Sequence, residues 1–465
     1  MNKLFSQIDK YKNEIAIIAP DKKNYSYKEI CKFSKKINSL VPYKSLVLVI
    51  SNNSASSIIG YVALMKTNNL ILLLDEKFKF DFIEKTIKNF KPNYIFAPNL
   101  FFKKIKKVKK ILNFEDFSLF KTKNTQHKKV NNINKLLIST SGSTQSPKFV
   151  RISEKNISTN TESIKRYLKI NSKQVTITTM PMAYSYGLSI INTHINCGCK
   201  IVVTNKTVFE KDFWNIIKRY KVNSFGGVPQ FYEQLKRIRF ENFDLSSLQY
   251  LTQAGGKLDK SYLEYFKKIS KNYKIKFVIM YGQAEASPRM SYLPWNYFSK
   301  KSESIGKAIK DSKFELINEK NKKIKKPFET GEIIYHGNNV SLGYGYNIKD
   351  LFKGDFNKGK LFTGDLAYKD KEGFYYIVGR KNRISKIFGI RIDLDEIEKN
   401  LKKKGFKVKC LPDNKYLKII SNNNYQVNKL KKIIKDFSGI RENYIIFKTN
   451  KKIENINNFK NINIA

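Results

Sequence analysis

Strand-like apolar runs alternate with segments whose apolar residues recur at helical spacing through the first three hundred residues. An apolar run at 45–50 is followed by a helical pattern over 54–66 and by a second apolar run at 70–74. The same order recurs at 200–203 and 209–220. Strands that alternate with helices favour layers of α-helices on mostly parallel β-sheets. We therefore expect an α/β fold over this part of the chain.

The pattern changes at about residue 328 to short strands and turns. Strands are predicted at 361–368 and 374–378, and the residues at 370–373 have the composition of the turn between them. Hairpins of this kind are typical of antiparallel sheets. This part of the chain therefore differs in architecture from the alternating part before it.

A polar break at 379–382 separates these strands from the end of the chain. Beyond it, 394–403 has a helical pattern, and two further strand–helix segments are predicted to follow. The remaining chain is long enough for a small α+β domain. We therefore expect a large domain of residues 1–380 and a small domain of residues 381–465.

The composition is that of a globular protein without a membrane span. Hydrophobic residues make up 41% of the chain, yet the apolar runs are far shorter than the roughly 18 residues that a span needs. The N-terminus has charges where a signal peptide would be apolar. Of the four cysteines only Cys197 and Cys199 are close in sequence, and the chain has three histidines, which argues against a metal centre. We predict a soluble cytoplasmic protein with free thiols.

The chain is strongly basic, with 89 Lys and Arg against 39 Asp and Glu and a formal net charge of +50. The lysines are dispersed along the whole chain, so we interpret them as a solvated surface and expect no nucleic-acid partner. One denser run lies at 101–112, where Ile105, Val108 and Leu112 have helical spacing. This pattern predicts a basic amphipathic helix, either with a solvated face or with a face for peripheral contact with a membrane or an acidic partner.

The stretch STSGSTQSPK at 139–148 lies between two predicted strands and precedes a helix that Ser153 would cap. It lacks the Walker A pattern. Gly142 allows the backbone a positive φ, successive N–H groups in such a turn can bind an anion, and Lys148 adds a positive charge. Hydroxyl donors are supplied by Ser141, Ser143 and Thr144. Taken alone, the stretch fits either a phosphate-binding loop or a polar hairpin turn.

Further segments match, in order, the motifs of one enzyme family. The stretch at 136–153 resembles the phosphate loop of the adenylate-forming superfamily, which includes acyl-CoA synthetases, peptide-synthetase adenylation domains and luciferases. The other matching segments are PMAYSYG at 181–187, QAGG at 253–256, YGQAE at 281–285, TGD at 363–365 and the hinge region at 379–398. The resemblance covers nearly the whole chain, and its ordered motifs are far more specific together than any one alone.

The resemblance implies a fold and a reaction. The fold is a large domain of layered α/β sheets plus a distorted β-barrel, followed by a small mobile α+β domain. In the reaction, a carboxylic acid attacks ATP to give acyl-AMP and pyrophosphate, and a thiol then displaces AMP. The thiol would belong to CoA or to the phosphopantetheine of a carrier protein. Mg²⁺ is needed because the reacting anions repel one another.

The resemblance also implies roles for individual residues. Glu285 would ligate Mg²⁺, Asp365 would accept hydrogen bonds from two ribose hydroxyls, and Arg380 would contact ribose or phosphate. Glu285, Arg380 and Lys452 are the catalytic candidates. The other nucleotide-binding candidates are Thr140, Ser141, Gly142, Ser143, Thr144 and Lys148 at the β- and γ-phosphates, Ala254, Gly255 and Gly256 beside adenine, and Tyr281, Gly282 and Gln283. The acyl-pocket candidates are Tyr184, Tyr186 and Gly187.

The chain departs from the family pattern at a few positions. The family usually ends in a segment with a proline, a glycine and a lysine that reaches the α-phosphate, and its nearest match here, at 447–453, lacks the proline and the glycine. Lys452 is the first candidate for that lysine and Lys451 the second. The other departures are Gln145 and Phe149 in place of glycines, Ala284 in place of a threonine and Asn382 in place of the hinge aspartate.

The acyl-pocket segment bears on the substrate. Residues 181–189 include no acidic residue that would pair with an α-amino group, which favours a simple carboxylic or fatty acid. Three alternatives stay open: a stand-alone adenylation domain that loads an amino or hydroxy acid onto a carrier protein, a degenerate protein that binds nucleotide without turnover, and a basic protein that binds RNA or membranes. The presence of Glu285, Asp365 and Arg380 argues against a degenerate site.

Overall fold

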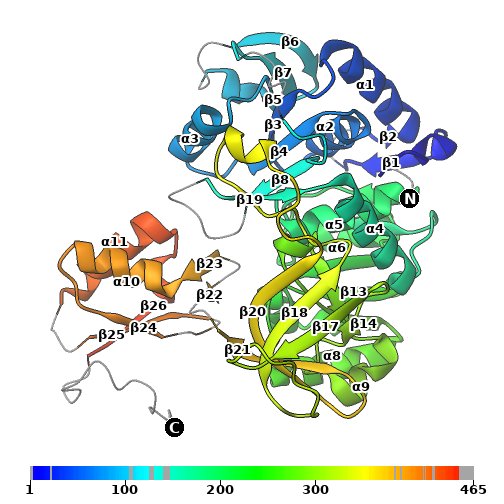
Figure 1. Ribbon diagram of the computed structural model, residues 1–465. Coiled ribbons are helices and arrows are strands. Elements are labelled where there is room, and N and C mark those ends of the chain that lie inside the picture. Colours follow the sequence, from blue (N-terminus) through cyan, green and yellow to red (C-terminus); the bar gives the residue numbers. More distant parts are fainter. Residues whose placement is uncertain are drawn as a thin grey trace. The chain divides into compact units, whose positions relative to one another are not determined.

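The computed structural model divides the chain into two units (Figure 1). The boundary between the two units lies between Gly379 and Arg380, one residue before the domain boundary that we propose between residues 380 and 381. The structure describes residues 4–449 with the exception of 21–22, 104–107, 125–129, 140–146, 382–383, 388–389, 412, 414 and 422–424.

An eight-stranded sheet contains the first apolar runs of the chain. Its central strands are parallel, and antiparallel strands flank them. In spatial order the strands are β19 (Tyr344–Gly345), β9 (Phe149–Ile152), β8 (Leu136–Ser139), β4 (Leu70–Asp75), β3 (Leu46–Ser51), β5 (Tyr94–Pro98), β7 (Phe117–Lys121) and β6 (Lys109–Phe114). The predicted runs at 45–50 and 70–74 thus form two adjacent parallel strands.

Both faces of this sheet are covered, which explains why its strands are apolar at every position. Val47 and Val49 of β3 pack with α1 (Tyr27–Leu40) and α2 (Ala55–Lys66) on one face. Leu46 and Leu48 pack on the other face with α3 (Phe80–Phe90). The helices begin where the sequence supplies caps: the Ser26 side chain accepts a hydrogen bond from the first turn of α1.

A nine-stranded sheet forms the second layer of the large unit. The central strands β1, β11, β10, β12, β13 and β14 pair parallel with their neighbours in this order. At the two edges, β2 pairs antiparallel with β1, β15 with β14, and β16 with β15. In spatial order the strands are β16 (Lys307–Ala308), β15 (Arg289–Tyr292), β14 (Lys276–Gly282), β13 (Tyr250–Gln253), β12 (Ser224–Gly227), β10 (Val175–Ile177), β11 (Lys200–Val202), β1 (Ile15–Ile18) and β2 (Tyr25–Ser26). The expected α/β fold with mostly parallel sheets is confirmed.

Helices cover both faces of the second sheet as well. Phe277 and Ile279 of β14 pack with α6 (Lys211–Arg219), α7 (Pro229–Arg237) and α8 (Lys260–Tyr273). The alternate residues of β14 face α4 (Glu154–Leu168) and α5 (Ser185–Asn196). Because α5 contributes to the cores of both sheets, it lies between them. As predicted, Ser153 caps α4.

A four-stranded sheet follows in the region where short strands and turns are predicted. Its neighbours β17 (Ser312–Ile317), β18 (Gly331–Gly337) and β20 (Lys360–Lys369) pair antiparallel, and β21 (Tyr375–Arg380) lies beside β20. Asp370 fixes the predicted turn, because its carboxylate accepts from the backbone N–H of Phe374 at 2.9 Å. A four-residue helix, α9 (Phe298–Lys301), precedes this sheet.

The second unit has its own core. A two-stranded sheet precedes one helix, and a three-stranded sheet packs with both helices of the unit around Leu401, Cys410 and Ile434. In chain order the elements are β22 (Ile384–Ile387), β23 (Ile390–Asp393), α10 (Leu394–Lys403), β24 (Lys409–Leu411), β25 (Leu417–Ser421), α11 (Val427–Ser438) and β26 (Ile445–Thr449). The expected α+β composition is confirmed.

Two local predictions are wrong. The dense basic run does not form one helix: a 3₁₀ turn at Asn99–Lys103 is followed by the edge strand β6, which pairs with β7 and buries Leu112. Lysines on an exposed edge strand discourage pairing with other chains. In the second unit, a single α-helix follows α10 within the described residues, because β24 and β25 pair directly with each other.

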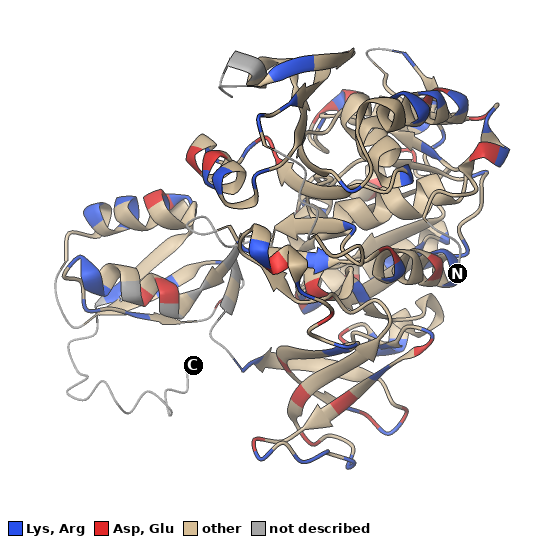
Figure 2. Cartoon of the chain, turned by 45° about the horizontal axis from the view of Figure 1, so that its top comes forward, with Lys and Arg blue, Asp and Glu red and all other residues tan. Residues whose placement is uncertain are grey.

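Lys and Arg occur on helices and strands of both units (Figure 2), as expected from their dispersion in the sequence. Among the described residues, no helix is long and apolar enough to cross a membrane.

Candidate active site

Part of the predicted site lies outside the described residues. The phosphate-loop candidates Thr140, Ser141, Gly142, Ser143 and Thr144 fall there, and so do Gln145, Asn382, Lys451 and Lys452. Lys148, at the end of the loop, is described and precedes β9. Arg380 ends β21 and begins the second unit. The remaining candidates all belong to the large unit.

Glu285 and Lys148 are brought to the same tyrosine. Glu285 lies in a 3₁₀ turn after β14 and is only 3% exposed. The Tyr344 hydroxyl donates to its Oε1 at 2.8 Å, and the Lys148 Nζ lies 3.8 Å from the centroid of the Tyr344 ring. Tyr344 pairs with Val150 in β9, so this strand pairing sets the tyrosine beside the end of the loop. The candidate phosphate lysine and the candidate magnesium ligand are thereby linked.

Arg151 holds the segment that carries Tyr344. Its guanidinium is 1% exposed and donates through Nη2 to the carbonyl of Leu342 at 2.7 Å. It also donates to the carbonyls of Lys353 at 2.8 Å and Gly354 at 3.0 Å. Burial lowers the pKa of Arg151 from its usual value. One buried cation therefore ties both ends of the 342–354 segment to β9.

Asp365 is held from the other end of the YGQAE segment. It is 3% exposed, and the Tyr281 hydroxyl donates to its Oδ2 at 2.5 Å. The Gln283 amide donates to the same oxygen at 3.3 Å and to the carbonyl of Thr363 at 3.0 Å. Burial and the nearby Asp365 raise the pKa of Tyr281 well above its usual value, so this hydroxyl remains a donor. Gly364 has φ +69°, which a side chain would strain.

Glycines shape the strand ends next to these carboxylates. Gly255 has φ +86°, and the Gln253 amide donates to the carbonyl of Gly256 at 2.8 Å, which closes the loop after β13. An added Cβ at Gly282 would lie 1.8 Å from the carbonyl oxygen of Pro288. The backbone at 282 therefore approaches the next segment too closely for any side chain.

The acyl-pocket candidates lie at the start of α5. Tyr184 is its N-cap residue, and Tyr186 is buried and donates to the carbonyl of Thr252 at 2.6 Å. A Cβ at Gly187 would lie 2.3 Å from the carbonyl oxygen of Pro181. Tyr186 packs in one cluster with Ala254, so the predicted acyl segment and the predicted adenine loop are neighbours.

A small cavity of about 20 Å³, room for about one water molecule, borders Tyr186. Its apolar wall includes Met280, and its polar wall includes Ser189, His194 and Arg289. Burial lowers the pKa of His194 to about 4, so its ring is neutral near pH 7. Arg289 begins β15 and is 3% exposed.

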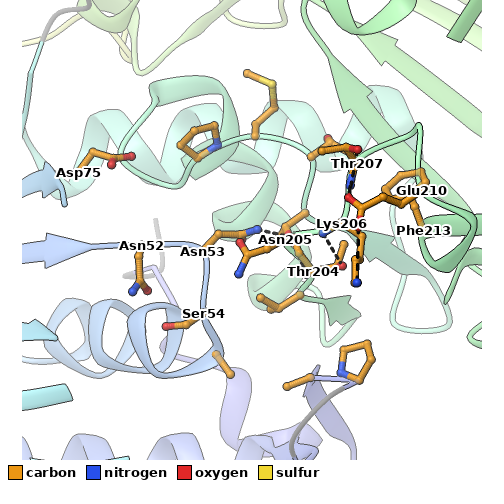
Figure 3. A pocket seen from close by; sticks show the side chains of 18 of the residues that line it. Asn52, Asn53, Ser54, Asp75, Thr204, Asn205, Lys206, Thr207, Glu210 and Phe213 are labelled. Carbon is orange, nitrogen blue, oxygen red and sulfur yellow. Dashed lines mark hydrogen bonds and ion pairs between the residues drawn. The ribbon is translucent and has the colours of Figure 1, made fainter. Parts of the chain in front are cut away.

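A larger hollow of about 730 Å³ borders Pro181 at the start of the acyl-pocket segment, and Figure 3 shows the side chains that line it. It is lined by residues that follow β3, β4, β10 and β11, and by Pro181. Its wall is polar: Asn53 donates to the carbonyl of Thr204 at 2.5 Å, and Glu210 accepts from the backbone of Thr207 at 2.8 Å. Lys206 forms an ion pair with Glu210 at 3.5 Å.

Three residues of this site have no motif in the sequence to mark them: Tyr344, Arg151 and Arg289. His336 is partly exposed and lies 3.2 Å from Glu315, and all four cysteines are buried free thiols, as the sequence predicts for the cysteines.

Comparisons with known proteins agree with this geometry. Residues 4–345 match the family of AMP-binding enzymes. A long-chain-fatty-acid–CoA ligase of Bacillus subtilis is 31% identical over 268 residues, which are 56% of this chain and 46% of that protein. A 2-succinylbenzoate–CoA ligase of Bacillus cereus is 30% identical over 247 residues, 53% of this chain and 49% of that protein. The chain thus spans about half the length of the curated relatives it matches.

Solved structures share the fold over nearly the full length. A double mutant of o-succinylbenzoate CoA synthetase from Bacillus subtilis, bound with a product analogue, has a TM-score of 0.77 at 19% identity and covers 98% of this chain and 97% of its own. A long-chain-fatty-acid-CoA ligase from Archaeoglobus fulgidus has a TM-score of 0.70 at 18% identity, with 96% and 97% covered. Since the family match extends over most of the chain and the fold agrees, the chain belongs to the AMP-binding enzymes of the adenylate-forming superfamily.

Proposed function

We propose that the protein activates a carboxylic acid with ATP, releasing pyrophosphate, and transfers the acyl group from acyl-AMP to a thiol. The observation that carries this proposal is the arrangement of two buried carboxylates at the YGQAE segment. Tyr281, at one end, donates to Asp365, and Glu285 is at the other end. A single short segment thus positions the candidate ribose ligand and the candidate metal ligand.

The donor set at Glu285 fits Mg²⁺. Within the described residues, no group of three or more His, Cys, Asp or Glu side chains could hold a metal ion on its own. Mg²⁺ keeps several waters and is commonly bound by one or two carboxylates together with substrate phosphates. Glu285 would supply that carboxylate, and Mg²⁺ would neutralise phosphate charge. Tyr344 would orient the carboxylate, and Lys148 would approach the phosphates from the adjacent loop.

The remaining nucleotide contacts follow from the same geometry. Asp365 would accept from the ribose hydroxyls, with its orientation set by Tyr281 and Gln283. The open backbone of Gly255 and Gly256 suits close approach of a flat base. By resemblance to the family, Arg380 would contact ribose or phosphate, and Lys452 would reach the α-phosphate. Neutralising Lys452 should slow acyl-AMP formation by about 10²-fold or more, as when other transition-state charges are lost, while transfer from preformed acyl-AMP changes much less.

The acid remains a matter for experiment. Because residues 181–189 are without acidic side chains, we expect a simple carboxylic acid rather than an amino acid, with fatty acids as one candidate class. The relatives named above act on acids of different kinds, a long-chain fatty acid and 2-succinylbenzoate. The proposal therefore covers a carboxylic acid without fixing its chain length.

The thiol would come from CoA or from a carrier protein. Both present the same phosphopantetheine arm, and the hollow beside Pro181, with a polar wall and a volume of about 730 Å³, is large enough to admit it. The ligase names of the relatives favour CoA. Buried free thiols at all four cysteines suit a reducing compartment, and we propose the cytoplasm.

ATP–pyrophosphate exchange with a panel of fatty, aromatic, dicarboxylic, hydroxy and amino acids tests the proposal. We expect exchange with at least one acid, and we expect Glu285→Gln to reduce it by about 10²-fold or more. Glu319→Gln, which changes an exposed carboxylate, is the matched control. ATP binding without exchange for any acid would contradict the proposal. Acyl transfer to CoA and to a phosphopantetheinylated carrier protein, measured in parallel, identifies the acceptor.

A further inference from the structure

The side chain of Arg289 is buried with weak hydrogen-bond partners. Its Nε donates to the Met280 sulfur at 3.3 Å, and its Nη2 donates to the Ser189 hydroxyl at 3.2 Å. Its guanidinium carbon lies 4.2 Å from the centroid of the Tyr186 ring. A thioether is a weak acceptor, and the hydroxyls of Ser189 and Tyr167 do not match the five N–H donors of a guanidinium.

The backbone of Arg289, in contrast, is firmly held. Asn160 accepts from its N–H at 3.3 Å and donates to its carbonyl at 2.8 Å. Asn339 donates to the same carbonyl at 2.8 Å. The position of the strand is therefore set by contacts that do not involve the guanidinium, which leaves the charged group available for another role.

No ion pair of the described residues includes Arg289, and none of the residues that line its cavity is acidic. Besides Arg289, the polar residues of the wall carry hydroxyls or the neutral His194 ring: Thr176, Tyr186, Ser189, Thr193, His194, Ser224, Tyr250 and Thr252. Burying a cation without a counter-charge is costly, and the cost is offset when an anion enters the site. A purely hydrocarbon acyl chain would leave this cost in place.

We propose that Arg289 selects an acid with a second carboxylate, which pairs with the guanidinium while the first carboxylate is activated. The inference rests on the proposed function and specifies its substrate class. Arginine suits this task because its planar donors can bind a carboxylate through two hydrogen bonds. The cavity beside Arg289 has a volume of about 20 Å³, little more than one water molecule needs, so only the second carboxylate would enter it. Tyr186, stacked against the guanidinium, fixes the direction in which it faces.

The test compares acids that differ only in the second carboxylate: glutarate against butyrate, adipate against pentanoate, and phthalate against benzoate. Calorimetry measures their binding to the full-length protein with ATP and Mg²⁺, and ATP–pyrophosphate exchange measures turnover. We expect at least one diacid to bind and react about 30-fold better than its partner, as expected for a desolvated charge pair. If each monoacid equals or exceeds its diacid in binding, the proposal is overturned.

Substitution of Arg289 tests the residue itself. Arg289→Met should remove the preference for the diacid while the monoacid binds as well or better, and Arg289→Lys should retain part of the preference. Arg166→Met, which removes an exposed arginine of α4, is the control and should change neither the preference for the diacid nor the binding of the monoacid. If Arg289 has a role in packing alone, Arg289→Met should lower the binding affinity for the diacid and the monoacid equally, and that result would refute the selection of a second carboxylate. If Arg289→Met does not fold, the proposal is tested by the diacid preference of the wild-type protein and by its partial loss in Arg289→Lys.

The two proposals can fail separately. Diacid binding that depends on Arg289, without exchange for any acid, would support the pairing and contradict the ligase function. Exchange with fatty acids but with no diacid would support the ligase function and overturn the pairing.

Discussion

Replacing Arg151 by methionine tests whether one buried cation holds part of the site in place. The change keeps an unbranched side chain of similar length but removes the donors to Leu342, Lys353 and Gly354. These carbonyls lie at the two ends of the segment that carries Tyr344. We therefore expect local loosening of 342–354 rather than a uniform loss of structure.

The magnitude follows from the surroundings of the three carbonyls. The bond to Leu342 is buried, and hydrogen bonds to charged groups contribute about 1.5–3 kcal/mol. Lys353 and Gly354 are exposed, so their carbonyls regain water and each loss should cost about 0.5–1 kcal/mol. Methionine also avoids the burial of a charge, which offsets part of the loss. The net cost should be about 2–3 kcal/mol, or about 30- to 160-fold more frequent opening of the segment.

Hydrogen exchange followed by mass spectrometry measures this opening directly. Peptides within 342–354 should exchange about 30- to 160-fold faster in Arg151→Met, while peptides of α8 remain unchanged. Arg166→Met serves again as the control. The affinity for ATP with Mg²⁺ should fall as well, because Tyr344 contacts Glu285 and Lys148. Unchanged exchange in 342–354 in a folded Arg151→Met protein would refute the role assigned to Arg151.

Three further predictions follow from single contacts. Tyr344→Phe keeps the ring but removes a hydrogen bond to Glu285, so the affinity for Mg²⁺ with ATP should fall about tenfold in a titration, with little change in thermal stability. Gly282→Ala places a Cβ 1.8 Å from the carbonyl oxygen of Pro288, and calorimetric unfolding should show a loss of about 2 kcal/mol or more. Burial lowers the pKa of His194 to about 4, against an ordinary value of 6.5. Its contribution to stability is therefore complete above pH 6.5 and is lost as the pH falls toward 4, and His194→Gln should reduce the acid sensitivity of unfolding by about 3 kcal/mol over that range.

The sequence predicts the parts of this protein that depend on local chemistry. The runs at 45–50 and 70–74 identify the strands because residues buried on both faces of a parallel sheet must all be apolar. Glu285 and Asp365 are found because they belong to short motifs whose spacing is set by one strand end or one turn. In both cases the information lies within about ten residues of sequence.

The contacts missed by the sequence join residues far apart in the chain. Tyr344 meets Lys148 and Glu285 only because β19 pairs with β9, and nothing near Tyr344 in sequence marks that pairing. The basic run at 101–112 was misread for a related reason. Its helical spacing is real, but pairing of β6 with β7 decides its conformation, since tertiary contacts override local periodicity.

The two buried arginines of the large unit show why burial by itself does not identify a ligand site. Arg151 and Arg289 are each nearly inaccessible, and each would be costly to bury without acceptors. Arg151 donates to three backbone carbonyls that hold one segment, although its buried Nε has no hydrogen-bond partner, so removing it should disturb structure first. Arg289 contacts a thioether, the hydroxyls of Ser189 and Tyr167 and a ring, and it borders a cavity, so removing it should disturb selectivity first. Bonds to the backbone therefore distinguish the structural arginine from the one that borders a cavity, and the contrasting outcomes of Arg151→Met and Arg289→Met test that distinction within one protein.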